Sequence, residues 1–249
     1  MYKKILNISG LLVLIIFIVG TFAFTSLERK DVLCRKIQVD YKADDLIQIN
    51  KDEIIRLVKS ADNEVLSKTL DQINSESIER SVEKHDAIIN AEVYKVIAKD
   101  TGSYRGILTV KVKHREPVVR VMSSSGNYYL DEFGSKIPIS TSYSANVLVT
   151  TGYFTEKYAK KELLPFVLYV ENDEFWQAQI EQVHVQKNGE ILLAPLVGEH
   201  IIELGELTDY QNKLLKMKAF YEQVLANDNW NKYKRVSLKY NNQVVAKKR

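Results

Sequence analysis

The sequence is poor in several residue types, and each shortage excludes a class of protein. Cys34 is the only cysteine, so no disulfide can form within the chain. The four prolines and ten glycines are too few for a low-complexity linker, and an aromatic content of 10% argues against long disorder. The folded parts of this chain must therefore be held together by packing, and the role of the single thiol stays open.

The chain also has little excess charge of either sign. The 249 residues include 35 basic and 32 acidic side chains, which gives a net charge of +3. A protein that binds nucleic acid needs a concentrated basic face, so this near balance gives no electrostatic argument for such a partner. The basic excess lies at the two ends of the chain, and we expect the closing Lys247, Lys248 and Arg249 to form a solvated tail.

The residue patterns of common enzymes are missing as well. The chain has no Gly-x-Ser-x-Gly elbow, no Walker loop and no Gly-x-Gly-x-x-Gly motif. Its histidines are scattered and lack the i, i+4 pairing with glutamate that builds a zinc site. We therefore expect no catalytic residue, no cofactor and no metal, and we expect His200 to be a surface side chain. The four histidines are His85, His114, His184 and His200.

One long apolar run, Ile5 to Phe24, follows Lys3 and Lys4 near the N-terminus. As a helix it would reach about 30 Å, the thickness of a bilayer's hydrocarbon core. Because positive charge is retained in the cytoplasm, we expect residues 1–4 to stay inside and the rest to be exported. The alternative is a cleaved signal peptide, but the run is too long for one and Thr21-Phe22-Ala23 is a poor cleavage site.

The first exported part shows the pattern of a small α+β domain. Asn50 and Asn74 each precede a helical stripe and are typical N-caps, with Glu53 placed to reach back in a capping box. Ile54 and Ile78 begin the two buried stripes. The predicted elements are a strand over 36–41, helices from Asn50 and from Asn74 or Ser75, and strands over 88–97 and 106–114. Strand, helix, helix, strand, strand is the order of a POTRA module, although other small folds share parts of it.

After Pro117 the pattern changes to short strands separated by turn signals. Two helices interrupt them, one over 160–172, where Pro165 is tolerable only within the first turn, and one over 210–226. The expected strands cover 118–122, 128–131, 147–149, 182–186, 191–195, 201–204, 235–240 and 244–247.

The last two of these strands indicate where a partner could bind. Asn241-Asn242 would join them as a two-residue hairpin turn, and Tyr240 would share a face with Val236. Nothing follows the final strand in the sequence to cover it, so its unpaired N–H and C=O groups could receive a strand from another chain. The alternative is an edge blunted by its lysines.

Distributed motifs resemble one family, the FtsQ/DivIB cell-division proteins, in particular their Bacteroidetes-type members. A departure is His85-Asp86, where the family commonly has a proline after the second POTRA helix. The matching residues are Ile78-Glu79-x-x-Val82, Ile88-x-x-Ala91-x-Val93-Tyr94, Arg115-Glu116-Pro117-Val118-Val119-Arg120-Val121, Tyr128-Tyr129-Leu130-Asp131-x-x-Gly134-x-x-x-Pro138-Ile139-Ser140, Phe175-Trp176-x-x-Gln179-Ile180-Glu181-Gln182, Val197-Gly198, Leu204-Gly205, Phe220-Tyr221, Trp230-x-x-Tyr233 and Gln243-Val244-Val245.

The resemblance implies a non-enzymatic scaffold of the division machinery that binds the bitopic proteins FtsB and FtsL and helps control septal peptidoglycan synthesis. It also implies a POTRA domain that serves septal recruitment through other division proteins, and a C-terminal strand that takes up a strand of FtsB. We expect a single-pass protein of the inner membrane, at the septum, with its folded domains in the periplasm. The implied strand-addition residues are Tyr240, Val244, Val245, Ala246 and Lys247.

The expected fold is α+β, in five parts. They are a cytoplasmic tail over 1–4, a transmembrane helix over 5–24, a connector over 25–33, a POTRA domain over 34–116, and over 117–249 a mainly antiparallel β domain with two helices. Two other readings are a membrane-anchored envelope enzyme with an unrecognised site and a POTRA-bearing translocation component. The second usually has several POTRA repeats or a membrane barrel, and the sequence shows neither pattern.

Overall fold

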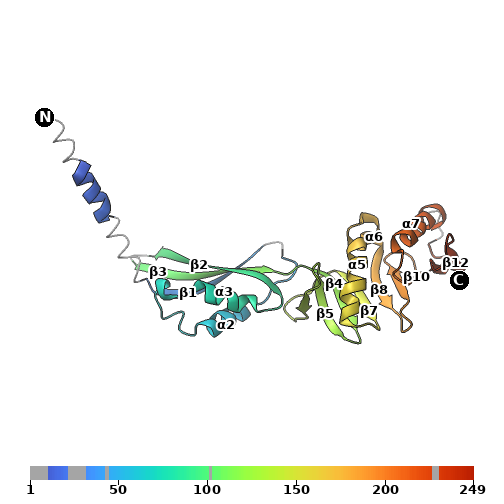
Figure 1. Ribbon diagram of the computed structural model, residues 1–249, viewed down its shortest axis with the longest axis horizontal. Helices are drawn as coiled ribbons and strands as arrows, with labels where there is room; N and C mark the ends of the chain where they lie inside the picture. Colours follow the sequence, from blue (N-terminus) through green and yellow to red (C-terminus); the bar gives the residue numbers. More distant parts are fainter. Residues whose placement is uncertain (1–10, 22–31, 43–44, 101–102, 226–229) are drawn as a thin grey trace. The chain divides into compact units, whose positions relative to one another are not determined.

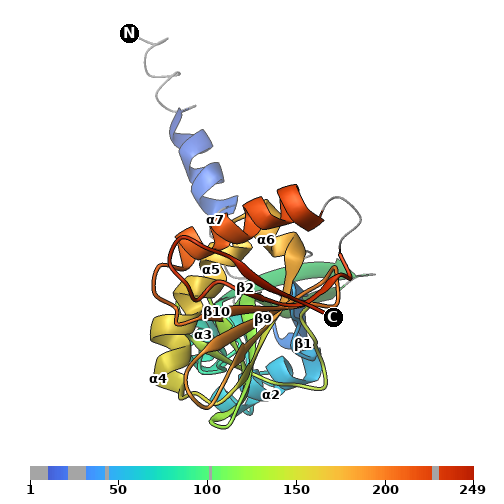
Figure 2. The ribbon, with the colours of Figure 1, turned by 90° about the vertical axis from the view of Figure 1, so that its right-hand side faces the viewer.

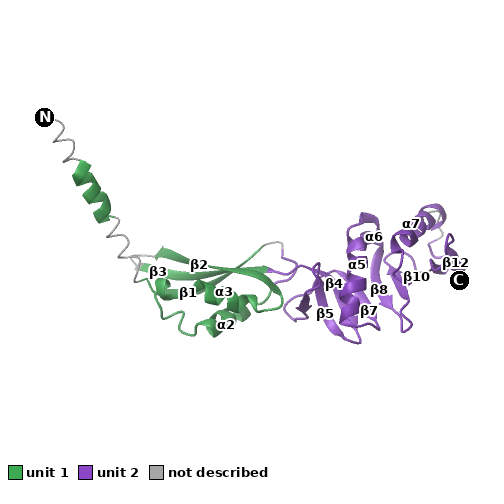
Figure 3. Ribbon diagram, viewed as in Figure 1, with its two compact units in different colours: residues 1–43, 49–113 green, residues 44–48, 114–249 purple. Residues whose placement is uncertain are grey.

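A computed structural model describes residues 11–21, 32–42, 45–100, 103–225 and 230–249. The chain divides into two compact units (Figure 3). Unit 1 takes residues 1–43 and 49–113, and unit 2 takes residues 44–48 and 114–249. Each unit has its own sheet, so each can be described by itself.

The N-terminal apolar run is only partly covered. Residues 11–21 form a helix, and the large apolar side chains from Leu11 to Val19 are all at least 45% exposed. Within the described ranges, no helix combines the length and the hydropathy that a membrane crossing requires. The predicted tail over 1–4, the two ends of the predicted span over 5–24 and most of the connector over 25–33 lie outside the described residues.

The folded part of unit 1 has the predicted order of two helices and three strands (Figure 1). Its sheet has the order β1-β3-β2, in which β1 runs parallel to β3. This confirms the expected α+β arrangement. The elements are β1 (Cys34–Tyr41), α2 (Lys51–Ala61), η1 (a 3-10 turn, Leu70–Gln72), α3 (Ser75–Glu83), β2 (Ile88–Asp100) and β3 (Ser103–His114).

Both helices of unit 1 begin at the predicted caps. The Asn50 side chain accepts a hydrogen bond from the amide of Asp52 at 2.9 Å, and that of Asn74 accepts from Ser77 at 3.1 Å. Each cap satisfies a backbone donor that has no partner inside its helix. The carboxylate of Glu53 lies 3.4 Å from Nε2 of His85.

The core of unit 1 forms between these helices and one face of the sheet. Cys34 is among its fully buried side chains, and burial raises the pKa of its thiol. The predicted stripe of the first helix is only half right, because Leu57 and Ala61 stay partly exposed. The side chains that were predicted to be buried and are so include Ile54, Val58, Ile78, Val82, Leu108, Val110 and Val112.

Unit 2 is built on a nine-stranded sheet of order β12-β11-β10-β9-β8-β7-β4-β5-β6. Two of its neighbouring strands, β9 and β10, are labelled in Figure 2. Five of its eight neighbouring pairs are antiparallel and three, β10 with β11, β4 with β7 and β7 with β8, are parallel. The strands are β4 (Pro117–Ser123), β5 (Gly126–Asp131), β6 (Lys136–Pro138), β7 (Leu148–Gly152), β8 (Ile180–Val185), β9 (Ile191–Pro195), β10 (Ile201–Gly205), β11 (Tyr233–Ser237) and β12 (Val245–Lys248).

The helices of unit 2 share one hydrophobic core with alternate residues of the sheet. Val119 and Val121 of β4 point into it, and Phe166, Trp176 and Leu214 fill it from the helices. Strand alternation places these valines on the same face of the sheet, so the helices cover that face. The helical segments are α4 (Glu156–Tyr158), the π-helical η2 (Ala159–Leu163), α5 (Leu164–Glu171), α6 (Glu174–Gln179), α7 (Tyr210–Phe220) and the π-helical η3 (Tyr221–Leu225).

The expectation of two helices in this unit is wrong in number. The predicted helix over 160–172 is one continuous run of α4, η2 and α5 that begins at Glu156. Pro165 therefore lies inside this run and not in its first turn as expected. It directly follows the start of α5 after the π-helical η2, where the regular hydrogen-bond ladder is already interrupted. The separate helix α6 was not predicted. Asp173 caps it by accepting from the amides of Phe175 and Trp176 at 3.0 and 3.2 Å, and it is too short to show a helical period. The predicted end at Ala226 lies outside the described residues.

One buried carboxylate organises the turn between β5 and β6. Asp131 is 3% exposed, and its Oδ1 accepts from the amides of Phe133 and Ser135 at 3.0 and 2.7 Å. Its Oδ2 lies 3.0 Å from Nη1 of Arg115. The residues of two motifs that carry the family resemblance therefore meet in a structural ion pair.

Replacing this carboxylate should destabilise unit 2. In Asp131→Asn the ion pair with Arg115 is lost in a buried site, and we expect a decrease of about 2 kcal/mol in the free energy of unfolding. Chemical denaturation followed by tryptophan fluorescence measures this decrease. The adjacent Glu132 is exposed, so Glu132→Gln is the matched control and should change the free energy by no more than about 0.5 kcal/mol. Equal effects of the two changes would contradict the role given to Asp131.

Candidate partner-binding edge

The last strand of the chain forms one end of the large sheet. β12 pairs antiparallel with β11, with Arg235 opposite Lys247 and Ser237 opposite Val245. In the described part of the chain no strand pairs with the other side of β12. The backbone groups on that side form an edge onto which a further strand can add.

Both β12 and its neighbour β11 are anchored in the core. Val236 of β11 and Leu238, just after it, are fully buried, and the amide of Leu238 donates to the carbonyl of Glu203 at 2.9 Å. Val244 and Ala246 are partly buried against the same core. The inner side of β11 and β12 is therefore held in place, while the edge itself stays accessible.

An aromatic cluster on the helical side supports β11. Tyr221 lies with its ring centroid 5.3 Å from that of Trp230, and Phe220 lies 5.6 Å from Tyr233 of β11. Nε2 of His200 lies 3.0 Å from the hydroxyl of Tyr221. These rings connect the π-helical end of the α7 segment to the strand next to the edge.

His200 is buried within this aromatic cluster. It is 1% exposed, which makes the expectation of a surface histidine wrong, because the cluster above covers it. Its Nδ1 has no hydrogen-bond partner in the described part of the chain, and burial lowers its pKa. Gly198 has φ of +90°, and a Cβ there would lie 2.8 Å from this nitrogen, so the turn before β10 needs glycine.

The charges beside the edge are mainly basic. The acidic residues on neighbouring segments are already paired: Glu203 with Arg235 at 2.5 Å and Glu190 with Lys239 at 2.6 Å. The hydrogen bond from Lys239 lowers the pKa of Glu190. The side chain of Lys247 in β12 is exposed. A partner strand with acidic side chains would therefore suit this edge better than a basic one.

The structure places four of the five predicted binding residues on or beside the edge strand. Val245, Ala246 and Lys247 belong to β12, and Val244 directly precedes it. Tyr240 does not share a strand face with Val236 as predicted. Because β11 ends at Ser237, Tyr240 lies in the connection to β12 and is 51% exposed.

The turn between these strands is also longer than predicted. The two-residue turn at Asn241-Asn242 would need strands that continue to Tyr240 and begin again at Gln243. Instead, Ser237 pairs with Val245, so residues 238–244 form the connection. Asn242 adopts φ of +56°, and Lys216 donates to the carbonyl of Tyr240 at 3.2 Å. The amide of Leu238 still donates to the carbonyl of Glu203 in β10, so the chain stays beside β10 after its pairing with β12 has ended.

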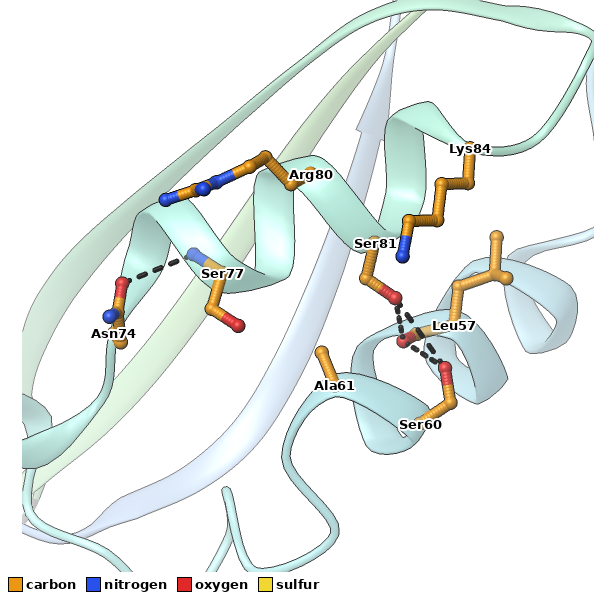
Figure 4. A pocket seen from close by; sticks show the side chains of 8 residues that line it. All are labelled: Leu57, Ser60, Ala61, Asn74, Ser77, Arg80, Ser81 and Lys84. Atoms are coloured by element: carbon orange, nitrogen blue, oxygen red, sulfur yellow. Dashed lines mark hydrogen bonds between the residues drawn. The ribbon is translucent and has the colours of Figure 1, made fainter.

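A groove of about 640 Å³ lies between α2 and α3 of unit 1 (Figure 4). Ser81 of α3 joins the two helices by donating to the carbonyl of Leu57 in α2 at 3.1 Å, and Ser60 donates to the same carbonyl from within α2 at 2.7 Å. On its rim, Arg80 pairs with Glu76 at 2.8 Å. The small side chains thus account for close helix packing. The remaining lining residues are Ala61, Asn74, Ser77 and Lys84.

The four histidines contact different partners in the structure. Their side-chain partners are Glu53 for His85, Asp45 for His114, Thr151 for His184 and Tyr221 for His200. Across the residues that the structure covers, no three His, Cys, Asp or Glu side chains group in a way that could hold a metal ion.

The sequence carries one signal for the His200 cluster. Phe220-Tyr221 and Trp230-x-x-Tyr233 place an excess of aromatic residues around one predicted helix and strand, which is typical of a packed cluster. The pairing of His200 with Tyr221 had no local signal, because 21 residues separate them in the chain.

Comparison with protein families gives two matches. A family described as FtsQ/DivIB, C-terminal related, matches residues 116–247, just over half of the 249 residues. A POTRA-like domain matches residues 32–100. No curated protein matches the chain.

The buried histidine should make stability depend on pH. Its pKa is lowered in the folded state, so the unfolded chain takes up a proton first as the pH falls below the ordinary histidine value of about 6.5. This contribution is complete above that pH and is lost as the pH falls toward the lowered value. His200→Gln removes it, so the free energy of unfolding should decrease less between about pH 7 and pH 5 than in the wild-type chain.

Denaturant unfolding at each pH measures this difference. The matched control is His184→Gln, because His184 lies half-buried on a strand and not in the aromatic cluster. A loss of slope in this control equal to that in His200→Gln would show that the effect is not specific to the buried site. Identical slopes for wild type and His200→Gln would show that His200 does not contribute.

Proposed function

We propose, since this chain belongs to the family of FtsQ/DivIB C-terminal related proteins, that it is a scaffold of the bacterial division machinery that docks a strand of an FtsB-like partner onto β12. The family consists of non-enzymatic division proteins, and the POTRA-like match accounts for the other folded unit. On this proposal, binding of FtsB and FtsL is the means by which the chain helps control septal peptidoglycan synthesis.

The observation that carries the proposal is the position of β12 at the end of the sheet. Main-chain hydrogen bonds to its outer side would supply affinity, whatever the partner's sequence. Contacts with alternate side chains would supply specificity. Val245 and Lys247 share one face of the strand, and Val245 is 44% exposed. A partner strand with an apolar and an acidic residue at alternate positions matches this face.

The proposal also gives the apolar N-terminal run a role. The exposed apolar side chains of residues 11–19 would be covered by lipid, and Lys3 and Lys4 would keep the N-terminus in the cytoplasm. The chain would then be a single-pass protein of the inner membrane with its folded units in the periplasm. The POTRA-like unit would recruit it to the septum through other division proteins.

Removal of the edge strand tests the docking site. A chain that lacks residues 244–249 should lose binding of the periplasmic segment of an FtsB-type protein, measured by isothermal titration calorimetry, because the backbone groups that receive the strand are gone. Cooperative unfolding of the shortened chain would show that the core persists. Unchanged affinity would exclude β12 as the site.

The change Lys247→Glu provides a graded control for this test. It keeps every backbone group of β12 and reverses one exposed charge. Affinity should decrease less than in the shortened chain, and the loss should be greater at low than at high salt, because a peripheral charge acts mainly on the association rate.

Localisation tests the proposed cellular role. A fluorescent fusion of the full chain should concentrate at midcell in dividing cells of the native host, and a fusion without residues 5–24 should not remain with the membrane. Fluorescence microscopy and membrane fractionation measure the two effects. An even distribution of the full chain along the cell envelope would contradict the role in division.

A further inference from the structure

The sheet of unit 1 has an edge of its own, and side chains close part of it. β2 is an outer strand in the order β1-β3-β2. Glu79 and Glu83 of α3 reach over this strand, where they accept from the amides of Val93 at 2.8 Å and Ala91 at 3.1 Å. These two amides therefore point away from β3, and the carboxylates occupy the positions that an added strand would need.

The backbone groups of β2 continue to alternate in the same way after Val93. In an antiparallel edge strand every second residue turns both its N–H and its C=O outward. Since Ala91 and Val93 do so, Lys95, Ile97 and Lys99 follow on the same side of β2. Glu83 and Glu79 are engaged with the earlier amides, so the outward groups of residues 95–99 lie past their reach.

Side-chain exposure changes at the same point along the strand. Ala91 and Val93 are 4% and 8% exposed, because the helices cover that face. Ile97 is on the same face but is 37% exposed, and Tyr94 on the opposite face is 43% exposed. This half of β2 thus has exposed apolar side chains on both faces, and no described strand pairs with its outer edge. Folded proteins usually block such an edge because other strands can pair with it.

We propose that residues 95–99 of β2 form a second docking edge, which takes an extended acidic segment of a partner protein, and that Glu79 and Glu83 confine docking to this half of the strand. This edge is distinct from β12 and lies in the other unit. It gives the POTRA-like unit a binding site of its own.

The charges of the edge favour a different protein over a second copy of this chain. The longest antiparallel self-pairing that leaves Glu79 and Glu83 in place is centred on Ile97, and it sets Lys95 opposite Lys99. Like charges directly opposite each other destabilise a strand pair. A partner with acidic residues at these two positions and an apolar residue opposite Ile97 removes the repulsion and covers the exposed side chain.

Each of the two lysines makes one contact within unit 1. Lys95 donates to the carbonyl of Ile73 at 2.7 Å, and Nζ of Lys99 lies 6.0 Å from the ring centroid of Tyr104 on β3. The charge of Lys95 helps lower the pKa of Asp71, but among the described residues neither ammonium forms an ion pair, so an acidic partner can pair with both. The partner segment would therefore read Glu-x-Val-x-Glu or an equivalent alternation of acidic and apolar residues.

Hydrogen exchange on the full chain in detergent micelles tests the proposal. The probe is a capped peptide with the pattern Glu-Val-Val-Val-Glu, and its control is the peptide Lys-Val-Val-Val-Lys. The acidic peptide should slow exchange of the outward amides in residues 95–99, and the basic peptide should not. No protection in this segment, or protection confined to β12, would overturn the proposal and leave the function proposed for β12 unaffected.

Two substitutions at one position separate edge pairing from side-chain contact. Ile97→Pro removes an outward amide without removing a bond to β3, so it should weaken binding of the acidic peptide about tenfold. Ile97→Thr keeps the amide and should bind within about threefold of wild type. Lys99→Glu should abolish the preference between the two peptides, because the edge then carries one charge of each sign. Equal affinity of the Pro and Thr variants would overturn pairing at this edge.

The role of the two glutamates has its own measurement. In the double variant Glu79→Ala with Glu83→Ala, peptide protection should extend to the amides of Ala91 and Val93. The matched control is Glu76→Ala, which removes an exposed carboxylate of the same helix that pairs with Arg80. Protection that stays confined to residues 95–99 in the double variant would show that the glutamates do not set the limit.

Discussion

The unpaired backbone of a sheet edge is the constraint on which this structure depends. Both folded units are open sheets, so each ends in strands whose N–H and C=O groups lack a neighbour. Water can satisfy these groups, but another strand satisfies them in a fixed register. The fold therefore either blocks an edge or presents it, and the two units show both solutions.

Each blocked edge has a recognisable device. β6 has only three residues and ends at Pro138, which cannot donate to an added strand. Part of β2 is covered by carboxylates that accept its outward amides. β12 is also short but contains no proline, no carboxylate among the described residues accepts its outward amides, and its backbone is held in place by the buried side chains of β11 and by the aromatic cluster around Tyr221. Rigid support below an accessible edge lowers the ordering cost of docking.

Most of the local structure could be predicted because local interactions decide it. Asn50 and Asn74 cap their helices with their own side chains, and the spacing of Ile78 and Val82 already defines a buried face. The family motifs were recognised correctly, but the structure shows that several of their residues have structural roles. Asp131 holds a turn, and Gly198 makes room for His200. A motif thus identifies the family more securely than it identifies a binding residue.

The order of strands and helices in unit 1, the two asparagine caps, the buried stripe of the second helix and the presence of a final strand could all be predicted, since each depends on residues close together in the chain. Which strands are neighbours depends on tertiary packing. Three features join segments that are distant in the chain and that packing brings together. They are the parallel pairing of β10 with β11, the burial of His200 against Tyr221, and the contact of two α3 carboxylates with β2. Tyr240 falls in the connection and not in β11, because the pairing of β11 with β12 ends at Ser237 and Val245.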